Sequence, residues 1–292
     1  MWSNDNDIIT DAQFGFQPNR GTVEAIFCLT TIIDTTLRKK KRLYCSFIDF
    51  KKAFDTVDRM KLWKKLSCIG IRGKMLKIIR GMYEGMKSCV RSKNAVSDFF
   101  QSQTGVLQGE VLSPILFSIY VNDFEMDFLT NNNVPVQLLE LNLFLLMYAD
   151  DMVIFAESAE ELQAMLNTLH SYTTKWNLTV NVEKTKIVIF RNGGKIRFDE
   201  KWFLNGENIS TVDKFMYLGM LINYNGKFND TQKQLSLQGR KAMFSLKSKT
   251  NEMYLNTETM LSLFDTYVGS VLNYGCEIWG FHNGKNVEKV QL

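Results

Sequence analysis

The sequence is poor in the residues that cross-link small proteins. Its 292 residues include only two histidines and five cysteines, and the cysteines are odd in number and widely spaced. Such a set fits neither a disulfide framework nor a structural zinc site, which needs clustered ligands. We therefore expect a protein of a reducing, intracellular compartment.

Proline and long apolar runs are also scarce. The three prolines leave no Pro-rich linker, and no internal repeat interrupts the chain. The longest apolar stretch, Leu138–Tyr148, contains Glu140 and Asn142, and a bilayer requires about 20 apolar residues. The first residues lack a basic region followed by an apolar one, so we expect no secretory signal. With 45% hydrophobic residues, the composition predicts one elaborate globular domain or two small ones, without contact with a membrane.

Two adjacent carboxylates stand between two apolar runs. Asp150 and Asp151 separate Leu143–Met147 from Met152–Ala156. Alternating apolar strands around a short polar break predict a β-hairpin whose turn carries both acids. Oxygen ligands suit magnesium, and magnesium held by carboxylates serves phosphoryl transfer. An Asp-Asp pair in a turn is also ordinary turn chemistry, so the pair alone does not decide between the two.

A third carboxylate ends another strand-like run. Asp49 lies near the end of Tyr44–Phe50, which is rich in β-branched and aromatic residues. A buried strand seldom carries a lone acid without a function, although an ion pair with Lys51 or Lys52 would also explain it. If Asp49 meets the hairpin acids, the three could hold two ions about 3.5 to 4 Å apart, the spacing found in polymerases and nucleases.

Positive charge is concentrated in one segment. Residues 59–93 contain eleven basic side chains and one acid, Glu84. Because uncompensated like charges repel one another, this imbalance favours a polyanion such as nucleic acid as the partner. A solvated helix surface is the alternative. The basic residues are Arg59, Lys61, Lys64, Lys65, Arg72, Lys74, Lys77, Arg80, Lys87, Arg91 and Lys93.

The periodicity predicts a mixed α/β fold. Apolar residues at helical spacing predict helices over Val23–Leu37, Met60–Leu66, Lys74–Tyr83 and Pro114–Leu129. Ser158 and Glu161 form the pattern of a capping box, which predicts a helix with Leu162, Leu166 and Leu169 on its buried face. Further strands are expected at Lys186–Phe190 and Met216–Ile222. After the turn-rich break Asn223–Asn229 the pattern becomes helical again.

Six blocks, in order and with matching spacing, resemble the reverse transcriptases of non-LTR (LINE-type) retrotransposons, with group II intron and retron enzymes as more distant relatives. Any one block would be weak, because such short patterns recur by chance, but six together are specific. The resemblance extends from about residue 13 to the end of the chain. The blocks are Gln13–Thr22, Phe47–Asp55, Gly105–Pro114, Tyr148–Asp151, Asn181–Lys186 and Tyr217–Gly219.

This resemblance implies a right-hand polymerase fold of the α/β (α+β) class. We expect partial fingers and a palm over residues 1–225 and an incomplete, helical thumb-like region over residues 226–292. The implied function is RNA-directed DNA polymerase activity, in which dNTPs are added to a DNA primer on an RNA template. The implied cofactor is a pair of Mg²⁺ ions, with Mn²⁺ as a substitute, and the implied place of action is the nucleus or the cytoplasm. Protein partners and oligomeric state are not implied.

The resemblance also assigns roles to single residues. Catalysis and metal binding fall to Asp49, Asp150 and Asp151. Nucleotide binding falls to Arg20, Phe50, Phe54, Gln108, Gly109 and Lys184. Primer or template contact falls to Gly105, Tyr217, Leu218 and Gly219.

Each role has a plainer alternative in the residues themselves. The Phe54 ring would crowd the 2′ position of an incoming nucleotide, or it simply fills the core. Gln108 would donate to template or nucleotide, or its loop merely precedes a helix that starts at Ser113. Arg20 would bind phosphate, and Lys184 would neutralise pyrophosphate, or both are surface cations. The glycine of Tyr217–Gly219 admits a primer end, or it serves a bulged hairpin.

Two departures from the family pattern matter. The family's finger region begins well before the position of Gln13, and Glu110 adds negative charge beside the proposed template path. These departures leave a second hypothesis open, in which the chain is a truncated, catalytically silent remnant that binds RNA or DNA through its basic residues.

Overall fold

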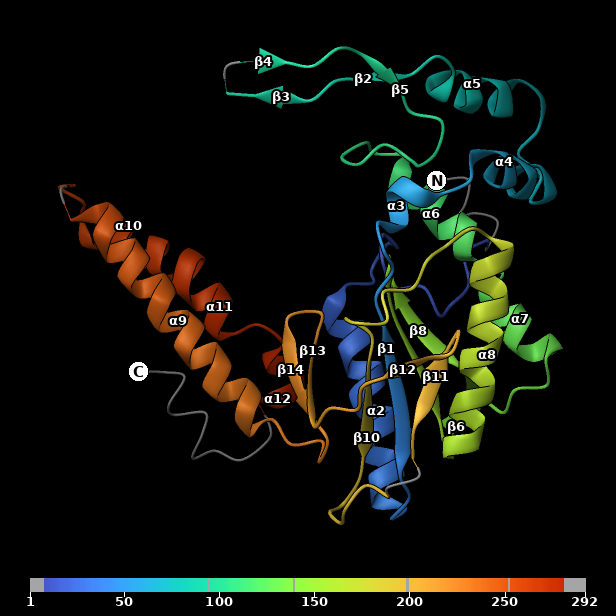
Figure 1. Ribbon diagram of the computed structural model, residues 1–292. Helices are drawn as coiled ribbons and strands as arrows, with labels where there is room; N and C mark the ends of the chain where they lie inside the picture. The colour runs from blue at the N-terminus through green and yellow to red at the C-terminus, as the bar shows by residue number, and fades with distance from the viewer. Residues whose placement is uncertain (1–7, 94, 139, 198–199, 252, 281–292) are drawn as a thin grey trace. The chain divides into compact units, whose positions relative to one another are not determined.

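The computed structural model, drawn in Figure 1, describes residues 8–93, 95–138, 140–197, 200–251 and 253–280. The chain passes more than once between two compact units, so each unit is discontinuous in sequence. Unit 1 comprises Met1–Gly21, Tyr44–Ile187 and Arg197–Ser210, and unit 2 comprises Thr22–Leu43, Val188–Ile196 and Thr211–Leu292.

The central sheet has the strand order β10-β1-β9-β8. Strand β1 (Leu43–Ile48) is buried along its whole length, as the continuous apolar run predicts. It pairs antiparallel with β9 (Asp151–Ala156), which pairs antiparallel with β8 (Leu145–Tyr148). The predicted strand at Lys186–Phe190 is β10 (Lys186–Phe190). The hairpin predicted around Asp150 and Asp151 is therefore confirmed.

Helix α8 (Ala159–Lys175) packs against β9 in unit 1 (Figure 1). Its capping box is present, because the Ser158 hydroxyl accepts from the Glu161 N–H at 3.1 Å and the Glu161 carboxylate accepts from the Ser158 N–H at 3.1 Å. Leu162, Leu166 and Leu169 are all fully buried. The sequence prediction for this helix is confirmed.

The helix predicted over Pro114–Leu129 is instead two helices, α6 (Ser113–Val121) and α7 (Phe124–Thr130). Two polar residues between them bond to other parts of unit 1. The Asn122 amide donates to Ile8 O at 2.6 Å and accepts from Thr10 N at 2.8 Å, and the Asp123 carboxylate accepts from Lys65 and from the Tyr172 hydroxyl. These tertiary bonds break the helical pattern that the apolar spacing suggested.

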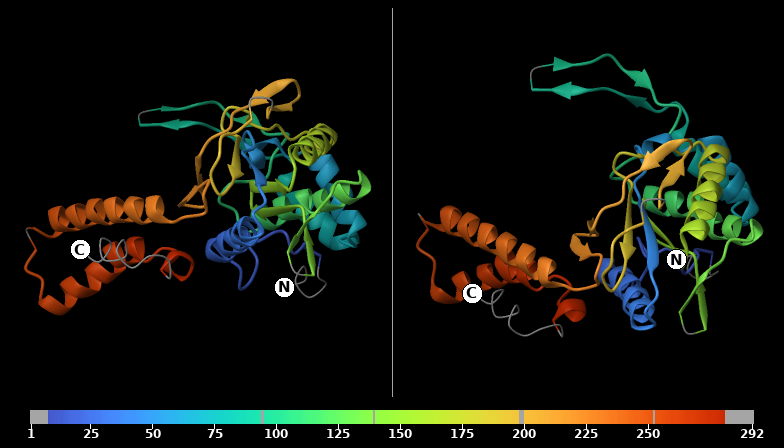
Figure 2. Two further views of the ribbon diagram at one scale, coloured as in Figure 1. Left: turned by 90° about the horizontal axis from the view of Figure 1, so that it is seen from below. Right: turned by 60° about the horizontal axis from the view of Figure 1, so that its bottom comes forward.

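The short helix α3 (Ala53–Thr56) precedes the basic segment. The segment itself begins with two helices, α4 (Arg59–Cys68) and α5 (Gly73–Tyr83), both as predicted. A narrow β-ribbon follows over residues 87–101, which we call the arm. It extends away from the helices of unit 1 in Figures 1 and 2. Its strands are β2 (Lys87–Ser88), β3 (Arg91–Ser92), β4 (Ala95–Val96) and β5 (Phe100–Gln101). Two further hairpins of unit 1 are β6 (Val136–Leu138) with β7 (Leu141–Leu143), and β11 (Trp202–Leu204) with β12 (Glu207–Ile209).

Unit 2 contains α2 (Thr22–Arg38) and a long helix, α9 (Asn229–Thr250). The segment after α9 packs back against it in Figures 1 and 2, and a Cβ added at Gly239 of α9 would lie only 2.2 Å from Leu272 Cδ2. None of the helices in the described ranges is long and apolar enough to cross a membrane. The returning elements are α10 (Thr257–Phe264), the π-helical turn η1 (Asp265–Gly269), α11 (Ser270–Leu272) and α12 (Cys276–Trp279).

The single strand predicted at Met216–Ile222 is a hairpin, β13 (Lys214–Tyr217) with β14 (Met220–Asn223). Its turn uses left-handed backbone at Leu218 (φ 45°) and Gly219 (φ 84°). The prediction was wrong because the apolar residues continue through the turn and only Gly219 marks it.

Candidate active site

Asp49 immediately follows β1, and a loop from residues 181–185 fixes its backbone. The Asp49 N–H donates to the Thr185 hydroxyl at 3.2 Å, and the Asp49 carbonyl accepts from the Asn181 N–H at 2.7 Å. Thr185 is fully buried. The Lys184 ammonium lies 3.9 Å from the Asp49 carboxylate on a side chain that is 70% exposed. The Asn181–Lys186 block thus holds the end of the strand that carries the first acid.

The strand register places the three acids at one end of the sheet. Ile48 is paired with Met152, so the next positions along the ladder are Asp49 and Asp151. Asp151 is itself paired with Tyr148 across the β8–β9 turn, and Asp150 lies in that turn. Ala149, which begins the turn, has left-handed backbone with φ 58°.

The three carboxylates interact electrostatically. Partial exclusion of water, followed by the charges of Asp150 and Asp49, raises the pKa of Asp151 to about 6. Burial and the charge of Asp49 also raise the pKa of Asp150. Neighbouring carboxylates that repel one another attract a divalent cation, which offsets their repulsion.

The donor set fits such a cation, since all three side chains offer carboxylate oxygens. Across the described residues, however, no three His, Cys, Asp or Glu side chains are gathered closely enough to form a ready-made metal cluster. The register brings Asp49, Asp150 and Asp151 together, and bringing their oxygens onto a shared ion requires side-chain adjustment.

The Gly105–Gln108 loop lies against the segment that follows Asp49. The Gln108 amide donates to the Asp55 carboxylate at 3.1 Å. Gly105 has φ 83°, and an added Cβ would lie 2.7 Å from Asp55 O, so only glycine fits there. Gly109 also has left-handed backbone, with φ 85° and open space around it.

Glu110 and Ser113, which follow this loop, bond to each other and to Tyr83. The Glu110 carboxylate accepts from the Tyr83 hydroxyl at 3.1 Å and from the Ser113 hydroxyl at 3.2 Å. Two hydrogen bonds thus hold the Glu110 carboxylate, the negative charge that we expected beside the template path. Ser113 is the first residue of α6, not its N-cap, which is Leu112.

The two phenylalanines assigned to the nucleotide site differ in position. Phe54 is partly exposed and stacks on Phe117, with ring centroids 4.7 Å apart. Phe50 is only 7% exposed, so its ring packs in the core, and its assignment to the nucleotide site stays a prediction.

Arg20 is held beside the N-terminal segment of unit 1. Its guanidinium donates to the Asp11 carboxylate at 2.5 Å and to Asp11 O at 2.8 Å, and lies 5.5 Å from the centre of the Phe14 ring. These contacts fix its position while leaving the side chain 34% exposed. A phosphate would compete with Asp11 for the same two guanidinium nitrogens of Arg20.

Two members of the basic segment are internal. The Arg59 guanidinium donates to the carbonyls of Gly105, Thr104 and Ser102 at 2.8, 3.0 and 2.6 Å. Lys65 is paired with Asp123 and lies 3.6 Å from the centre of the Trp176 ring, and burial lowers its pKa to about 8. These two cations are therefore not available to a polyanion, unlike the exposed basic residues of the same segment.

Most of the remaining basic residues are exposed. Among the described residues, no acidic side chain forms an ion pair with the basic groups of α5 or the arm. The arm also exposes Val90, Phe99 and Phe100 by 62%, 69% and 51%. The exposed basic residues are Lys64, Arg72, Lys74, Lys77, Arg80, Lys87, Arg91 and Lys93.

The Tyr217–Gly219 turn belongs to unit 2 and is described there by itself. The Tyr274 hydroxyl lies 2.6 Å from Leu218 O, and the Tyr274 ring lies 3.4 Å from the position of a Cβ added at Gly219. Tyr217 is buried, with 2% of its surface exposed. The close contact between the turn and Tyr274 leaves little room for a side chain at residue 219.

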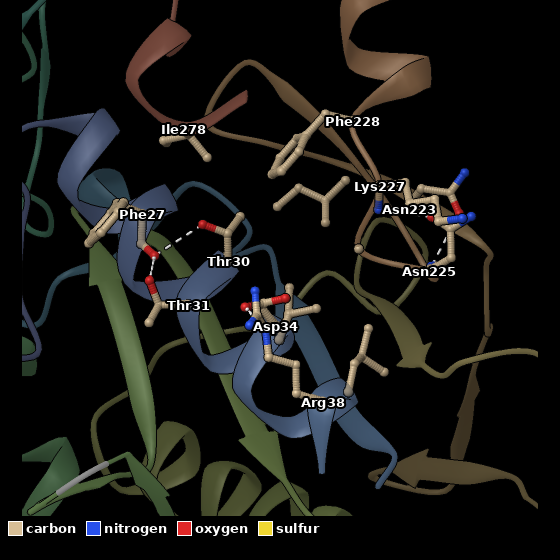
Figure 3. A pocket seen from close by; sticks show the side chains of 14 residues that line it. Phe27, Thr30, Thr31, Asp34, Arg38, Asn223, Asn225, Lys227, Phe228 and Ile278 are labelled. Carbon is tan, nitrogen blue, oxygen red and sulfur yellow. Dashed lines mark hydrogen bonds and ion pairs between the residues drawn. The ribbon is translucent and has the colours of Figure 1, made fainter. Parts of the chain in front are cut away.

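A cavity of about 240 Å³ lies within unit 2, between α2 and the turn before α9. Figure 3 shows Phe27, Phe228 and Ile278 around it, with Asp34 and Arg38 on the helix side. None of the residues predicted for catalysis, nucleotide or primer lines it. We therefore place the candidate site at the carboxylates of unit 1 and not in this cavity.

Several supporting residues escaped the sequence reasoning. Gln13, Thr185 and Asn181 contact the backbone beside the three acids, yet the sequence indicated them only as members of the blocks that carry the resemblance. Their position in the same blocks as the predicted site residues was the available signal.

Comparison with known proteins decides the family. A family model described as reverse transcriptase (RNA-dependent DNA polymerase) matches residues 2–222. The chain belongs to the reverse transcriptase family. This family match and the relatives described next confirm the predicted resemblance to the reverse transcriptases of non-LTR retrotransposons.

Two insect mobile elements encode similar reverse transcriptases. The RNA-directed DNA polymerase from mobile element jockey of Drosophila funebris is 26% identical over 289 residues, covering 96% of this chain and 30% of that protein. The probable RNA-directed DNA polymerase from transposon BS of Drosophila melanogaster is 28% identical over 302 residues, covering 98% and 32%. The chain thus spans about a third of the length of these relatives.

A solved structure supports the reverse transcriptase fold. Telomerase from Candida albicans, in complex with the TWJ fragment of telomeric RNA, matches with a TM-score of 0.55 at 11% identity, covering 96% of this chain and 52% of that one. At this identity the likeness concerns the fold alone. The mixed α/β, palm-type polymerase fold expected from the sequence is confirmed.

Proposed function

We propose that this chain is the RNA-directed DNA polymerase domain of a non-LTR retrotransposon and adds dNTPs to a DNA primer on an RNA template. The observation that carries the proposal is the placement of Asp49, Asp150 and Asp151 at one end of the sheet, where burial and the charge of Asp49 raise the pKa of both hairpin acids. Family membership gives this cluster its reaction class.

Asp49 and Asp150 would hold two Mg²⁺ ions, or Mn²⁺, with Asp151 assisting. When bound, such ions lower the pKa of an attacking 3′ hydroxyl and neutralise charge on the leaving pyrophosphate. The residues of this chain supply the rest. The β8–β9 turn orients two of the acids, the Asn181–Lys186 block fixes the third, and Lys184 places a cation beside Asp49.

The neighbouring loops would bind the substrates. Phe54 and Gln108 lie on segments that bond to each other, through Val106 N–H to Phe54 O at 2.8 Å and Gln108 to Asp55, so they form one wall for the incoming nucleotide. Arg20 would contact triphosphate or template from its place on Asp11. Gly105 and the Tyr217–Gly219 turn would allow close approach of template and primer.

The finer division of the fold belongs to the same proposal. Residues 1–225 would provide partial fingers and the palm, and residues 226–292 a thumb-like region. The antiparallel packing of α9 with α10 and α11 supports a helical thumb. The exposed cations of α5 and the arm would bind the RNA backbone. The site of action would be the nucleus or cytoplasm.

Primer extension on an RNA template tests the proposal. With dNTPs and Mg²⁺, Asp150→Asn should reduce extension by more than about 100-fold, beyond the cost typical of losing a residue that only supports a metal ligand. The control Glu207→Gln, which neutralises an exposed acid on β12, should leave extension unchanged.

RNA binding measured in the same preparations separates a loss of catalysis from a loss of RNA affinity. Asp150→Asn should bind RNA normally. The triple variant Lys87→Gln, Arg91→Gln, Lys93→Gln should lower the slope of log affinity against log salt by about 2 to 3, since each lost phosphate contact accounts for about 0.7 to 0.9. A wild-type chain that binds RNA in this salt-sensitive way yet extends no primer would support the silent nucleic-acid-binding remnant and overturn the proposed polymerase.

A further inference from the structure

Gln13 occupies an unusual position behind the turn that carries Asp150 and Asp151. Its side chain is completely buried. The backbone on either side of it pairs with β8, because the Phe14 N–H donates to Met147 O at 2.7 Å and the Met147 N–H donates to Ala12 O at 2.8 Å. The segment therefore adds a short strand-like edge to β8, ending where the turn begins.

The Gln13 side chain reaches past this edge to the turn itself. Its carboxamide oxygen accepts from the Ala149 N–H at 3.1 Å and from the Gly15 N–H at 2.9 Å. An amide oxygen has two lone pairs, so both bonds can form at once. One atom of Gln13 thus ties the first residue of the turn to the N-terminal segment, 136 positions away in sequence.

Close packing reinforces this bond. A Cβ added at Gly15 would lie 2.4 Å from Ala149 N and 3.1 Å from the Tyr148 carbonyl carbon. Ala149 itself has φ 58°, a left-handed conformation that an alanine adopts only when its surroundings enforce it. The enforcing contacts here are the Gln13 oxygen and the Gly15 backbone.

The remaining polar atom of Gln13 makes the arrangement costly. Within the described residues, the Gln13 amide nitrogen is buried without a hydrogen-bond partner. An apolar side chain of similar length would fill the same space without burying that donor. What glutamine adds over such an apolar side chain is the acceptor for Ala149 and Gly15, and this accounts for a polar residue in the core.

We infer that Gln13 is a positioning residue that sets the orientation of the Asp150–Asp151 turn through its bond to the Ala149 N–H. This inference rests on the proposed function for its catalytic consequence, but not for its structural one. Gln13 touches neither the carboxylates nor, by this inference, the substrates. It acts by fixing the backbone from which Asp150 projects.

Hydrogen exchange tests the structural consequence without any activity. In Gln13→Met, which keeps the length but removes the acceptor, the Ala149 and Gly15 amides should exchange about 10-fold faster or more. The Phe14 and Met147 amides bond to backbone and should keep their protection. Unchanged protection of Ala149 would overturn the inference.

Steady-state kinetics tests the catalytic consequence. Since a misplacement of about 1 Å can lower a rate by about 100-fold, Gln13→Met should reduce kcat for primer extension by about 10- to 100-fold. The KM for dNTP should change less than about twofold, because the residues proposed for nucleotide binding are not altered. A kcat equal to that of the wild type would overturn the inference.

Gln163→Met is the matched control. Gln163 also bonds a backbone with its carboxamide, accepting from Phe203 N at 2.9 Å and donating to Phe203 O at 2.9 Å, but it does so at the β11–β12 hairpin. Its loss should lower Tm to a similar extent while leaving kcat unchanged. Equal losses of kcat in both variants would reduce Gln13 to a general stabilising residue.

Two further outcomes are separable. If Gln13→Met does not fold, Gln13→Asn withdraws the amide by one methylene and should show the same faster exchange at Ala149. If the wild-type chain extends no primer, the proposed function fails, while the exchange measurement still decides whether Gln13 fixes the turn.

Discussion

The two units each contain a tight hairpin turn with left-handed backbone, and the turns are secured differently. Ala149 (φ 58°) begins the β8–β9 turn, and Leu218 (φ 45°) begins the β13–β14 turn. Gln13 accepts a hydrogen bond from the first turn, whereas Tyr274 lies with its hydroxyl 2.6 Å from a carbonyl of the second. In both, a side chain distant in sequence holds a conformation that local sequence disfavours.

The difference lies in what surrounds each turn. Beside Ala149, the space of a Gly15 Cβ is occupied by backbone, which cannot yield cheaply. Beside the second turn, the space of a Gly275 Cβ is occupied by the tip of Met220, a flexible side chain. The turn that carries two acids is therefore the more rigidly constrained, as expected where geometry matters to chemistry.

The largest contrast should come from adding one methyl group next to each turn. Gly15→Ala places Cβ 2.4 Å from Ala149 N, so the turn must move, and we expect primer extension to fall about 100-fold. Gly275→Ala places Cβ 2.4 Å from the flexible tip of Met220 and at ordinary contact distance from Trp279, so its main penalty is the φ of 65°, which costs about 1 kcal/mol. Extension assays and thermal unfolding of both variants measure the contrast.

The comparison of Gly15→Ala with Gly275→Ala also shows whether the first turn is the more constrained. If Gly15→Ala extends primers at the wild-type rate with the wild-type Tm, the backbone beside Ala149 is free to move, and the two turns do not differ as described here.

The sequence predicted the acids and their strands well because those features are local. Asp49 follows a buried apolar run, and Asp150 and Asp151 interrupt two others, so the alternation was sufficient to place them. Antiparallel register then set Asp49 level with Asp151. The resemblance to reverse transcriptases supplied the chemistry that alternation alone could not.

Contacts between distant segments were beyond the sequence. A charge count could not show that Arg59 bonds three carbonyls more than forty residues later, or that Lys65 meets Asp123 beneath an aromatic ring. The apolar alternation predicted Met216–Ile222 as one strand because the neighbours of Leu218 are apolar on both sides, and only the Tyr217–Gly219 block of the resemblance indicated a turn there. Gln13 was missed as a separate residue because its two acceptor bonds depend on the final fold.

A smaller effect should follow from removing the hydroxyl that contacts the second turn. Tyr274→Phe deletes the group 2.6 Å from Leu218 O, and losing one such hydrogen bond costs about 1 kcal/mol. Urea unfolding should show this loss as a lower midpoint at an unchanged slope. Tyr254→Phe, at a fully exposed tyrosine, should leave the midpoint unchanged, and an equal loss in both variants would remove Tyr274 as the support of the turn.

The smallest effect concerns the charge of the first turn and depends on pH. Asp151 has a pKa of about 6 in the folded chain and about 3.9 when unfolded. Between these values the folded state keeps a proton that the unfolded state has lost, so stability falls as pH rises from about 4 to 6 and stays lower above that window. Below pH 4 both states are protonated and the difference disappears.

Asp151→Asn removes this penalty. Because Asp151 is exposed at the start of β9, solvent screening limits the gain to less than about 1 kcal/mol, so Tm at pH 7.5 without divalent metal should rise by about 1 to 2 °C. At pH 4 the variant and the wild type should melt together, and Glu207→Gln should change neither value. A gain of equal size at both pH values would mean that charge repulsion is not its source, and added Mg²⁺ should narrow the gap at pH 7.5 by stabilising only the chain that retains all three carboxylates.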